Sequence, residues 1–226
     1  MDIVDVIKKR QSIRGFKPDP VPLDLIKKIM SQALWAPSWA NTQPWDFAVV
    51  SGKKLKEIQD GFMNRGDVEA KSEVARPYEF PEPYVSRKRG LMAKEKTFLS
   101  EADFKNRRVD NFGHYGATTC IYLLVGKSFV YQSKGVNVWP LYDCGSIVQN
   151  IMLLATNYGL GTIAQAQAVT YPDIIRKVVK IPEDKLLALG IAIGYPDWDK
   201  TRNKFRSDRE PLENVAAFYG FEEAGS

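Results

Sequence analysis

Two arginine-rich stretches stand near opposite ends of the chain. The stretch "RQSIR" offers Arg10, Ser12 and Arg14 where the first expected helix ends. The stretch "FRSDREP" offers Arg206 and Arg209 close to the C-terminus. Guanidinium groups match phosphate oxygens with paired hydrogen bonds, and a serine hydroxyl adds a short donor. Exposed arginine pairs are common, so either stretch alone is weak evidence. The two stretches could meet one anion from the two ends of the chain.

A third stretch, "APSWANTQPW" at 36–45, combines aromatic and hydrogen-bonding side chains without helical or strand periodicity. Trp39 and Trp45 offer flat apolar faces, and the asparagine, threonine and glutamine at 41–43 offer donors and acceptors. This mixture suits a planar heterocycle with a polar edge. The alternative is that the tryptophans anchor a core or an interface and that the polar groups satisfy turns.

The usual catalytic motifs are missing from the sequence. His114 is the only histidine, so a multi-histidine metal site is impossible and a Ser-His-Asp triad would have to use it. Its turn-like neighbours, "FGHYG", favour a packing or surface role. The "GLGT" at 159–162 is not GxGxxG and follows a helical pattern, and GxxxxGK[ST], HExxH and GxSxG are absent. We therefore expect no metal and chemistry that protein nucleophiles do not carry.

The composition is that of a folded globular protein. The chain has 226 residues, of which 44% are hydrophobic and 26% charged, enough for a sizeable core. The 32 Lys and Arg exceed the 27 Asp and Glu by five, which suits an anionic ligand, a nucleic acid or solubility alone. The two cysteines form no CxxC pattern, and the longest apolar run is far too short for a membrane span. We expect a reduced, cytoplasmic protein with no membrane partner.

Hydrophobic periodicity predicts a single layered α+β domain over 1–226, because helices and strands are mixed without strict β-α-β alternation. Helices are expected after the capping residue Asp2 and over 21–34, 53–64, 142–159 and 171–179, and strands over 46–51, 119–126 and 186–196. Residues 64–112 are rich in charge and proline and only weakly periodic. This segment predicts an irregular or helical excursion, either a lid over the active site or a solvated insertion.

In their order and spacing these stretches resemble the FMN-dependent nitroreductase family. The resemblance covers most of the chain, through "KKRQSIRGF", "APSWANTQPWDFAVV", "QNIMLLATNYGLGT", "YPDIIRKVVKIP", "IAIGYPD" and "RSDREPLENV". No single motif is specific, but their succession is. Within the family, "NFGHYGAT" followed by "YDCGSIVQNIMLLA" is most similar to the nitrobenzoate-reductase-like branch.

The resemblance implies a nitroreductase-like fold, with a central, mostly antiparallel sheet flanked by helices, in an intertwined homodimer with two interfacial FMN sites. It implies an FMN-dependent NAD(P)H oxidoreductase that reduces nitroaromatic, quinone or similar electron-poor substrates by ping-pong hydride transfer. The isoalloxazine carries such chemistry while the protein binds and orients it. No catalytic side chain is then required.

The resemblance also implies which residues bind FMN. Arg10 and Ser12 would hold phosphate and ribityl oxygens, and Arg14 would approach the pyrimidine edge. The loop around Trp39 would come from the other subunit and line the ring, although this tryptophan is bulkier than the usual small residue. Gln11 stands where an arginine is often found. The implied cofactor-binding set is Arg10, Gln11, Ser12, Arg14, Pro37, Ser38, Trp39, Asn41, Ala164, Gln165, Ala166, Arg206 and Arg209.

Other functions remain open at this point. A family member could catalyse a different reaction, such as activated-alkene reduction or reductive dehalogenation, or could store or sense flavin without turnover. A basic nucleic-acid-binding domain would predict salt-dependent binding and no flavin. Because no known nucleic-acid motif is present and the charge excess is small, we expect no nucleic-acid partner.

Overall fold

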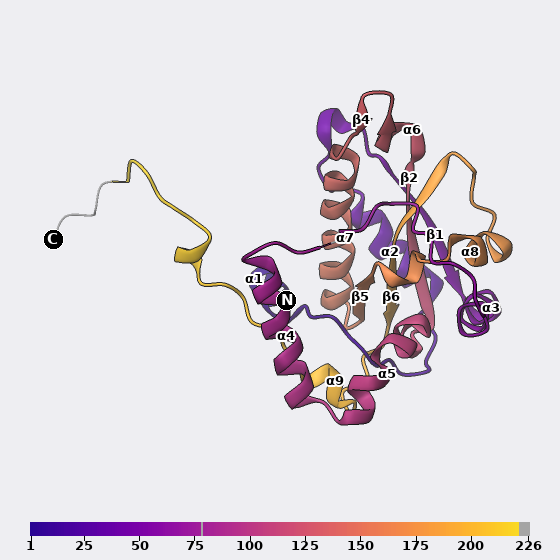
Figure 1. Ribbon diagram of the computed structural model, residues 1–226, viewed down its shortest axis with the longest axis horizontal. Helices are drawn as coiled ribbons and strands as arrows, with labels where there is room; N and C mark the ends of the chain where they lie inside the picture. The colour runs from indigo at the N-terminus through magenta and orange to yellow at the C-terminus, as the bar shows by residue number, and fades with distance from the viewer. Residues whose placement is uncertain (78, 222–226) are drawn as a thin grey trace.

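An antiparallel sheet forms the centre of the molecule. The computed structural model describes residues 1–77 and 79–221. Among these, four strands lie in the order β1-β2-β6-β5, namely β1 Trp45–Ser51, β2 Thr119–Gly126, β6 Lys185–Gly194 and β5 Gly161–Gln165. Every neighbouring pair in this sheet is antiparallel. The predicted α+β fold with a mostly antiparallel central sheet is confirmed (Figure 1).

Helices flank the sheet, and α4, α5 and α9 lie together beyond one of its ends (Figure 1). The helices are α1 Ile3–Lys9, α2 Leu23–Ala33, α3 Gly52–Met63, α4 Tyr84–Phe98, α5 Glu101–Phe112, α6 Lys127–Val130, α7 Trp139–Asn157, α8 Pro172–Val178 and α9 Thr201–Lys204. A small hairpin joins β3 Tyr131–Gln132 to β4 Gly135–Val136, and single 3-10 turns occur at Trp39–Asn41, His114–Gly116, Gln167–Val169 and Leu212–Asn214. After α9 the chain first passes along α4 and then extends outward from the body of the domain (Figure 1).

Strand β2 shows why helices cover both faces of the sheet. All of its residues except the last are buried. Ile121, Leu123 and Val125 pack into a core that includes residues of α2 and α7. The alternating Tyr122 and Leu124 pack into a second core with residues of α3 and α8. Because successive strand side chains point to opposite faces, a continuously apolar strand needs cover on both sides.

Local sequence signals set several element ends as predicted. The Asp2 side chain caps α1 by accepting a hydrogen bond from the Val4 amide at 2.9 Å. Gly159 follows the end of α7 with a φ of +79°, a conformation that favours glycine. Helix α7 begins at Trp139 rather than at the expected residue 142, because Pro140 is compatible with the first helical turn, where its missing N–H is not needed.

The excursion at 64–112 contains a loop followed by helices α4 and α5, and Glu73 fixes its beginning to the sheet. The Glu73 carboxylate accepts hydrogen bonds from Nε and Nη2 of Arg176, each at 3.1 Å, and from the Leu187 amide at 2.6 Å. The Tyr131 hydroxyl donates to the Glu73 carbonyl oxygen at 2.8 Å. One side chain therefore ties the excursion to α8 and β6.

His114 is a core residue, so of the predicted packing or surface role the structure shows packing. Its side chain is 0% exposed, its Nε2 lies 3.2 Å from the Tyr122 hydroxyl, and its ring stacks on Phe62 with centroids 6.1 Å apart. Burial disfavours the charged imidazolium and lowers the pKa of His114 to about 4. The histidine is therefore neutral in the folded protein near neutral pH.

We predict that His114 makes the stability depend on pH between about 4 and about 6.5. In this window the imidazole binds a proton in the unfolded chain but not in the folded protein. The stabilising contribution of the neutral histidine to the free energy of unfolding is therefore complete above about pH 6.5 and falls on acidification. At about pH 5 the free energy of unfolding should be lower by about 2 kcal/mol, from about 1.4 kcal/mol for each pH unit. Denaturant unfolding of wild type and His114→Gln at about pH 7.5 and about pH 5 measures it, and the variant should lack this part of the loss. An NMR titration of the single imidazole with a folded-state pKa near 6.5 would contradict the prediction.

Candidate functional site

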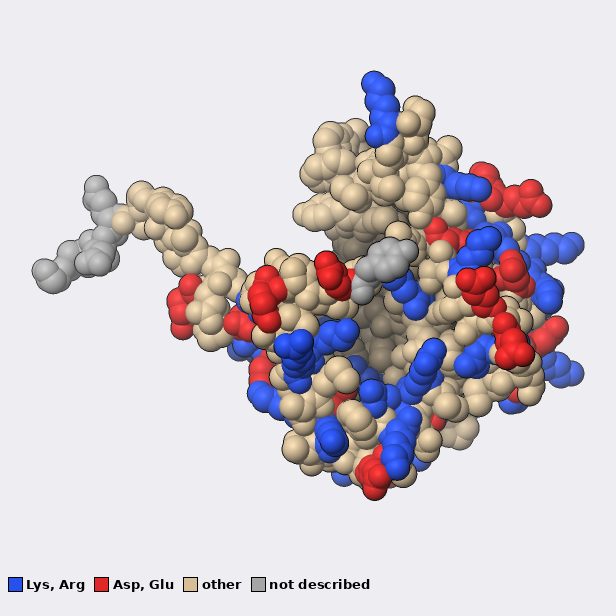
Figure 2. Space-filling model, viewed as in Figure 1, with Lys and Arg blue, Asp and Glu red and all other residues tan. Residues whose placement is uncertain are grey.

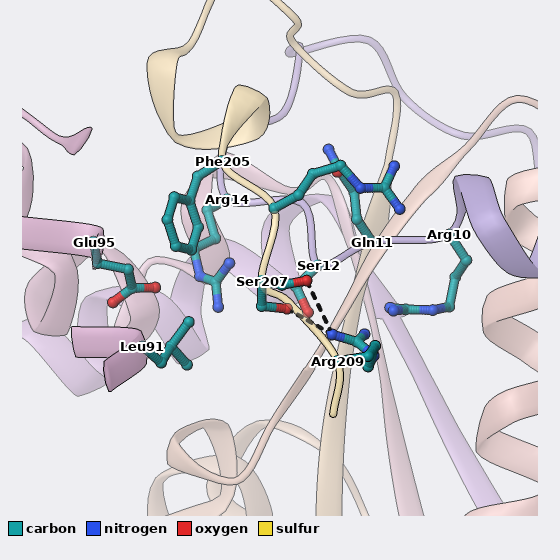
Figure 3. A pocket seen from close by; sticks show the side chains of 10 residues that line it. Arg10, Gln11, Ser12, Arg14, Leu91, Glu95, Phe205, Ser207 and Arg209 are labelled. Atoms are coloured by element: carbon teal, nitrogen blue, oxygen red, sulfur yellow. Dashed lines mark hydrogen bonds between the residues drawn. The ribbon is translucent and has the colours of Figure 1, made fainter. Parts of the chain in front are cut away.

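The fold brings the two arginine-rich stretches into one pocket, which we call the anion pocket. The chain after α1 forms its first wall, and the chain after α9 forms its second wall (Figure 3). Helix α4 closes one side. The pocket is lined by Arg10, Gln11, Ser12, Arg14, Leu91, Glu95, Phe205, Arg206, Ser207 and Arg209. All the implied residues of the N-terminal stretch and both implied C-terminal arginines therefore lie together.

Asn203 joins the two walls. This residue is 1% exposed. Its Oδ1 accepts a hydrogen bond from the Arg14 amide at 2.6 Å, and its Nδ2 donates to the carbonyl oxygens of Gly15 at 2.7 Å and Asp197 at 2.8 Å. Its own carbonyl oxygen accepts from Gln11 Nε2 at 2.5 Å. One buried residue thus sets the spacing between segments that lie far apart in the sequence.

The first wall also runs along the edge of β5. Ser12 forms a parallel bridge with Thr162, and the Ile13 amide donates to the Thr162 carbonyl oxygen at 3.0 Å. Gly161 permits this approach, because a Cβ there would lie only 2.5 Å from Ile13 Cγ1. The first wall of the anion pocket therefore lies beside the edge strand β5, on which Ala164 is exposed.

Four arginines and one carboxylate, Glu95, line the anion pocket, so cations are in excess there. Within residues 1–77 and 79–221, Arg10, Arg206 and Arg209 form no ion pair. Burial, followed by the nearby charges of Arg209 and Arg206, lowers the pKa of Arg10. Like charges held close together destabilise one another, and an anion between them reverses the sign of that interaction. The pocket is built for an anion such as a phosphate.

Helix α4 engages the two carboxylates that flank Arg209 in the sequence. Lys94 pairs with Asp208, and Arg87 Nε lies 3.0 Å from Glu210 Oε1. Arg209 itself donates to oxygen atoms of the two residues that precede it. Because α4 occupies the neighbouring acids, the Arg209 charge remains available to a ligand.

The four implied residues of the 36–45 loop lie outside the anion pocket of their own chain: Pro37, Ser38, Trp39 and Asn41. The Trp39 amide donates to Asp143 Oδ2 at 3.0 Å, and its ring meets Trp139 edge-on with centroids 4.4 Å apart. The Trp39 side chain is nevertheless 55% exposed. The expected contribution of these four loop residues to the FMN site of another subunit stays a prediction.

The remaining implied residues, Ala164, Gln165 and Ala166, stand where β5 ends. Ala164 and Ala166 are exposed, whereas Gln165 is 2% exposed. Its Nε2 donates to both the carbonyl oxygen and Oδ1 of Asn111 at 2.9 Å. The Gln165 side chain therefore ties β5 to α5 and is not accessible to a ligand. The neighbouring alanines are the accessible side chains of this segment.

Sequence reasoning missed the anchoring residue Asn203 and four residues that line the pocket: Leu91, Glu95, Phe205 and Ser207. The stretch "FRSDREP" contains Phe205 and Ser207, so their position next to Arg206 was the available signal. Asn203 stands in the polar run "RNKF", where nothing indicates a buried amide.

The other reactive groups of the described chain do not form a second catalytic site. Burial raises the pKa of both thiols, Cys120 and Cys144, to about 12, so neither is a thiolate near neutral pH. Among the described residues, no group of three or more His, Cys, Asp and Glu side chains is arranged to hold a metal ion. Over the same residues, no helix combines the length and apolar character needed to cross a bilayer.

Known proteins are similar to this chain in both sequence and fold. A profile of the Nitroreductase family matches residues 7–195. The chain is 29% identical over 226 residues to a chloronitrobenzene nitroreductase of Comamonas testosteroni, with 96% of each chain covered. It is 28% identical over 227 residues to a 4-nitrobenzoate reductase of Pseudomonas putida, covering 98% of this chain and 97% of that one.

A solved structure supports the same assignment. The FMN and NADPH-dependent nitroreductase NfnB from Sphigopyxis sp. strain HMH superposes with a TM-score of 0.87 at 25% identity, covering 98% of this chain and 100% of that one. The sequence match, the fold and the joined arginine stretches agree: the chain belongs to the Nitroreductase family.

Proposed function

We propose that the protein is an FMN-dependent NAD(P)H nitroreductase. The observation that carries the proposal is the anion pocket, in which Arg10, Arg206 and Arg209 converge with Ser12. Glu95 also lines the pocket, but within the described residues none of the three arginines forms an ion pair. Three guanidiniums and a hydroxyl fit the phosphate monoester of FMN. The relatives that match nearly the full chain are nitroreductases, and the similar solved structure is FMN and NADPH-dependent.

The residues of the chain bind and orient, and the cofactor supplies the redox chemistry. Arg10, Arg206 and Arg209 would hold the phosphate, and Ser12 would contact phosphate or ribityl oxygens. Arg14, whose amide is fixed by Asn203, would place a cation at the pyrimidine edge, where a positive charge favours the anionic reduced flavin. When bound, FMN supplies two-electron transfer from NAD(P)H to an electron-poor acceptor.

We infer that residues 64–112 cover this site within a single domain of residues 1–226. Leu91 and Glu95 of α4 line the anion pocket, and Phe98 packs against Phe205 with ring centroids 5.4 Å apart. None of the α4 residues, all of which the structure describes, is buried. Since little apolar packing holds α4 in place, it is the wall best suited to move when ligands enter.

We also infer an intertwined homodimer. The segment after α9 presents large apolar side chains, each at least 61% exposed: Leu212, Val215, Phe218, Tyr219 and Phe221. Trp35 is 90% exposed on the body of the domain. Apolar area of this extent is stabilised when a partner removes it from water. A second copy would cover it and would bring its 36–45 loop to the anion pocket.

The purified protein is expected to show flavin absorption near roughly 370 and roughly 450 nm, either as isolated or after addition of FMN. Anaerobic addition of NADH or NADPH should bleach these bands, and a nitroaromatic compound should restore them. A protein that neither carries nor takes up FMN would refute the proposed function, whereas bound flavin that no donor reduces would leave only a storage or sensor role.

Replacing Asn203 should weaken FMN binding, because the two walls of the anion pocket lose their common anchor. Asn203→Leu keeps the approximate volume and removes three side-chain hydrogen bonds, so the Kd of FMN should rise at least about tenfold. Asn64→Leu, an exposed asparagine at the end of α3, is the matched control. Quenching of FMN fluorescence measures Kd, and circular dichroism checks the fold. A folded Asn203→Leu protein with the wild-type Kd would disprove the anchoring role.

Removal of residues 211–226 should convert the dimer to monomers and lower FMN affinity together, because the exposed apolar segment and the shared site depend on the same contact. Analytical ultracentrifugation of the wild type and the truncated chain, with FMN titrations, tests this coupling. The inferred homodimer is incorrect if the wild type sediments as a monomer that is fully loaded with FMN.

A further inference from the structure

A second basic hollow adjoins the anion pocket. We call it the α5 groove; it lies between α4 and α5 and is lined by Arg14, Glu95, Lys105, Arg107, Arg108 and Gln167, among others. Arg14 and Glu95 line both the α5 groove and the anion pocket. Figure 2 shows that this face of the molecule is hollowed, with lysine and arginine side chains gathered on the side where α4 and α5 lie. The two sites are therefore continuous.

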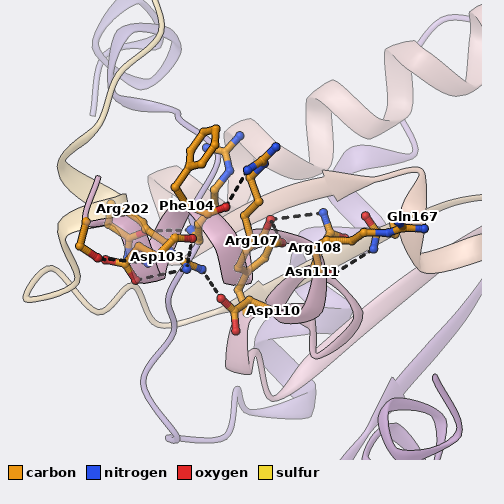
Figure 4. Close-up of polar contacts among 12 residues, drawn as sticks. Asp103, Phe104, Arg107, Arg108, Asp110, Asn111, Gln167 and Arg202 are labelled. Carbon is orange, nitrogen blue, oxygen red and sulfur yellow. Dashed lines mark hydrogen bonds and ion pairs between the residues drawn. The ribbon is translucent and has the colours of Figure 1, made fainter. Parts of the chain in front are cut away.

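The acids of α5 pair with cations: Glu101 with the groove-lining Lys105 at 2.6 Å, and the two aspartates with Arg202. Arg202, which is 8% exposed, contacts Asp110 Oδ2 through Nη1 at 2.5 Å and Asp103 Oδ1 through Nη2 at 3.2 Å (Figure 4). Within the described parts of the chain, Arg107 and Arg108 form no ion pair with a carboxylate. Glu95 is the acid that lines the groove. Because Glu101 offsets the charge of Lys105, the positive charge that α5 brings to the groove comes from Arg107 and Arg108.

Arg107 is held through its side chain, and Arg108 is held through its backbone. The Arg107 guanidinium lies 3.9 Å from the centroid of the Phe104 ring, and its Nη1 donates to the Phe104 carbonyl oxygen at 2.6 Å. The Arg108 carbonyl oxygen accepts from Gln167 Nε2 at 2.9 Å, which ties its backbone to the turn after β5 (Figure 4). The Arg108 side chain has no hydrogen-bond partner in the described structure. One guanidinium is thus preorganised, and its neighbour is free to pair with an oxyanion.

We propose that Arg107 and Arg108 bind the anionic group of a molecule that reacts at the flavin, either a phosphate of NAD(P)H or the carboxylate of a nitrobenzoate. The proposal rests on the proposed function, because the shared residue Arg14 places the α5 groove next to the cofactor. A hydride donor or acceptor must bring its planar ring to the flavin, while its charged group lies outside the flavin site. Paired guanidiniums match the oxygens of either anion, and both ligands are more anionic than an uncharged nitroarene.

The test compares Arg107→Gln/Arg108→Gln with Arg89→Gln. Arg89 is an exposed arginine of α4 that does not line the α5 groove, so its replacement removes one charge without touching the groove. Steady-state kinetics with each donor and each acceptor in turn give a separate KM for NADPH, NADH, nitrobenzene and its 4-carboxylate derivative. If the groove holds the donor's phosphates, both donors should show a KM that is at least about tenfold higher. If it holds the carboxylate, only the nitrobenzoate should bind more weakly, while nitrobenzene keeps its wild-type KM.

Binding measurements separate this inference from the proposed function. Calorimetry is carried out with NADP+ and with benzoate, on the flavin-loaded and the flavin-free protein. For the ligand that the groove binds, the double variant should lose affinity equally in both forms of the protein and show a weaker salt dependence than wild type. The inference is overturned if neither ligand is affected, even when NADPH still bleaches the flavin. It is also overturned if the Kd of FMN changes instead, because the arginines would then belong to the cofactor site. Failure of both donors to reduce wild-type flavin would refute the proposed function, and the calorimetry would still decide the role of the groove.

Discussion

The hydrogen bonds of the buried Asn203 amide are the constraint on which the anion pocket depends. The pocket needs cations from two chain segments that repel one another until an anion is bound. Hydrogen bonds to uncharged groups must therefore hold the walls together, and one of them runs from the Arg206 guanidinium to the Lys8 carbonyl oxygen. Asn203 does so by pairing its amide oxygen and nitrogen with backbone groups on both sides, and the bridge from Ser12 to Thr162 joins the first wall to β5. Breaking such buried bonds leaves unsatisfied polar groups, which makes the arrangement rigid.

The positions of the ion pairs concentrate positive charge on one face of the molecule, although the net charge is modest. The excess of five basic residues is spread over the whole chain, but ion pairs remove acids from the places where ligands would bind. Lys94 and Arg87 engage the acids beside Arg209, and Arg202 engages two acids of α5. The guanidiniums left over line the anion pocket and the α5 groove. Composition therefore understates the local field, because the pairing exists only in three dimensions.

The features that could be predicted from sequence are those encoded by neighbouring residues. Strand β2, the Asp2 cap and the stop at Gly159 follow from short patterns, and the arginine stretches could be identified by residue type. The ties that position them join ordinary polar residues far apart in the chain, as with Glu73 and Arg176 or Gln165 and Asn111. No local signal marks such pairs. Helix α4 lacked a clear pattern because, with none of its described residues buried, it has little apolar face to repeat.

The 36–45 loop shows how far one chain completes its own site. Ala40, Asn41 and Gln43 have φ values of +47°, +58° and +45°, a conformation that costs free energy for residues other than glycine. The bond from the Trp39 amide to Asp143 helps hold this strained path, yet the Trp39 ring remains more than half exposed. The backbone strain of this loop is offset only when burial of the exposed ring by another group contributes favourable free energy. In the proposed homodimer the covering group is the flavin site of the second copy, so subunit association and cofactor binding would stabilise each other.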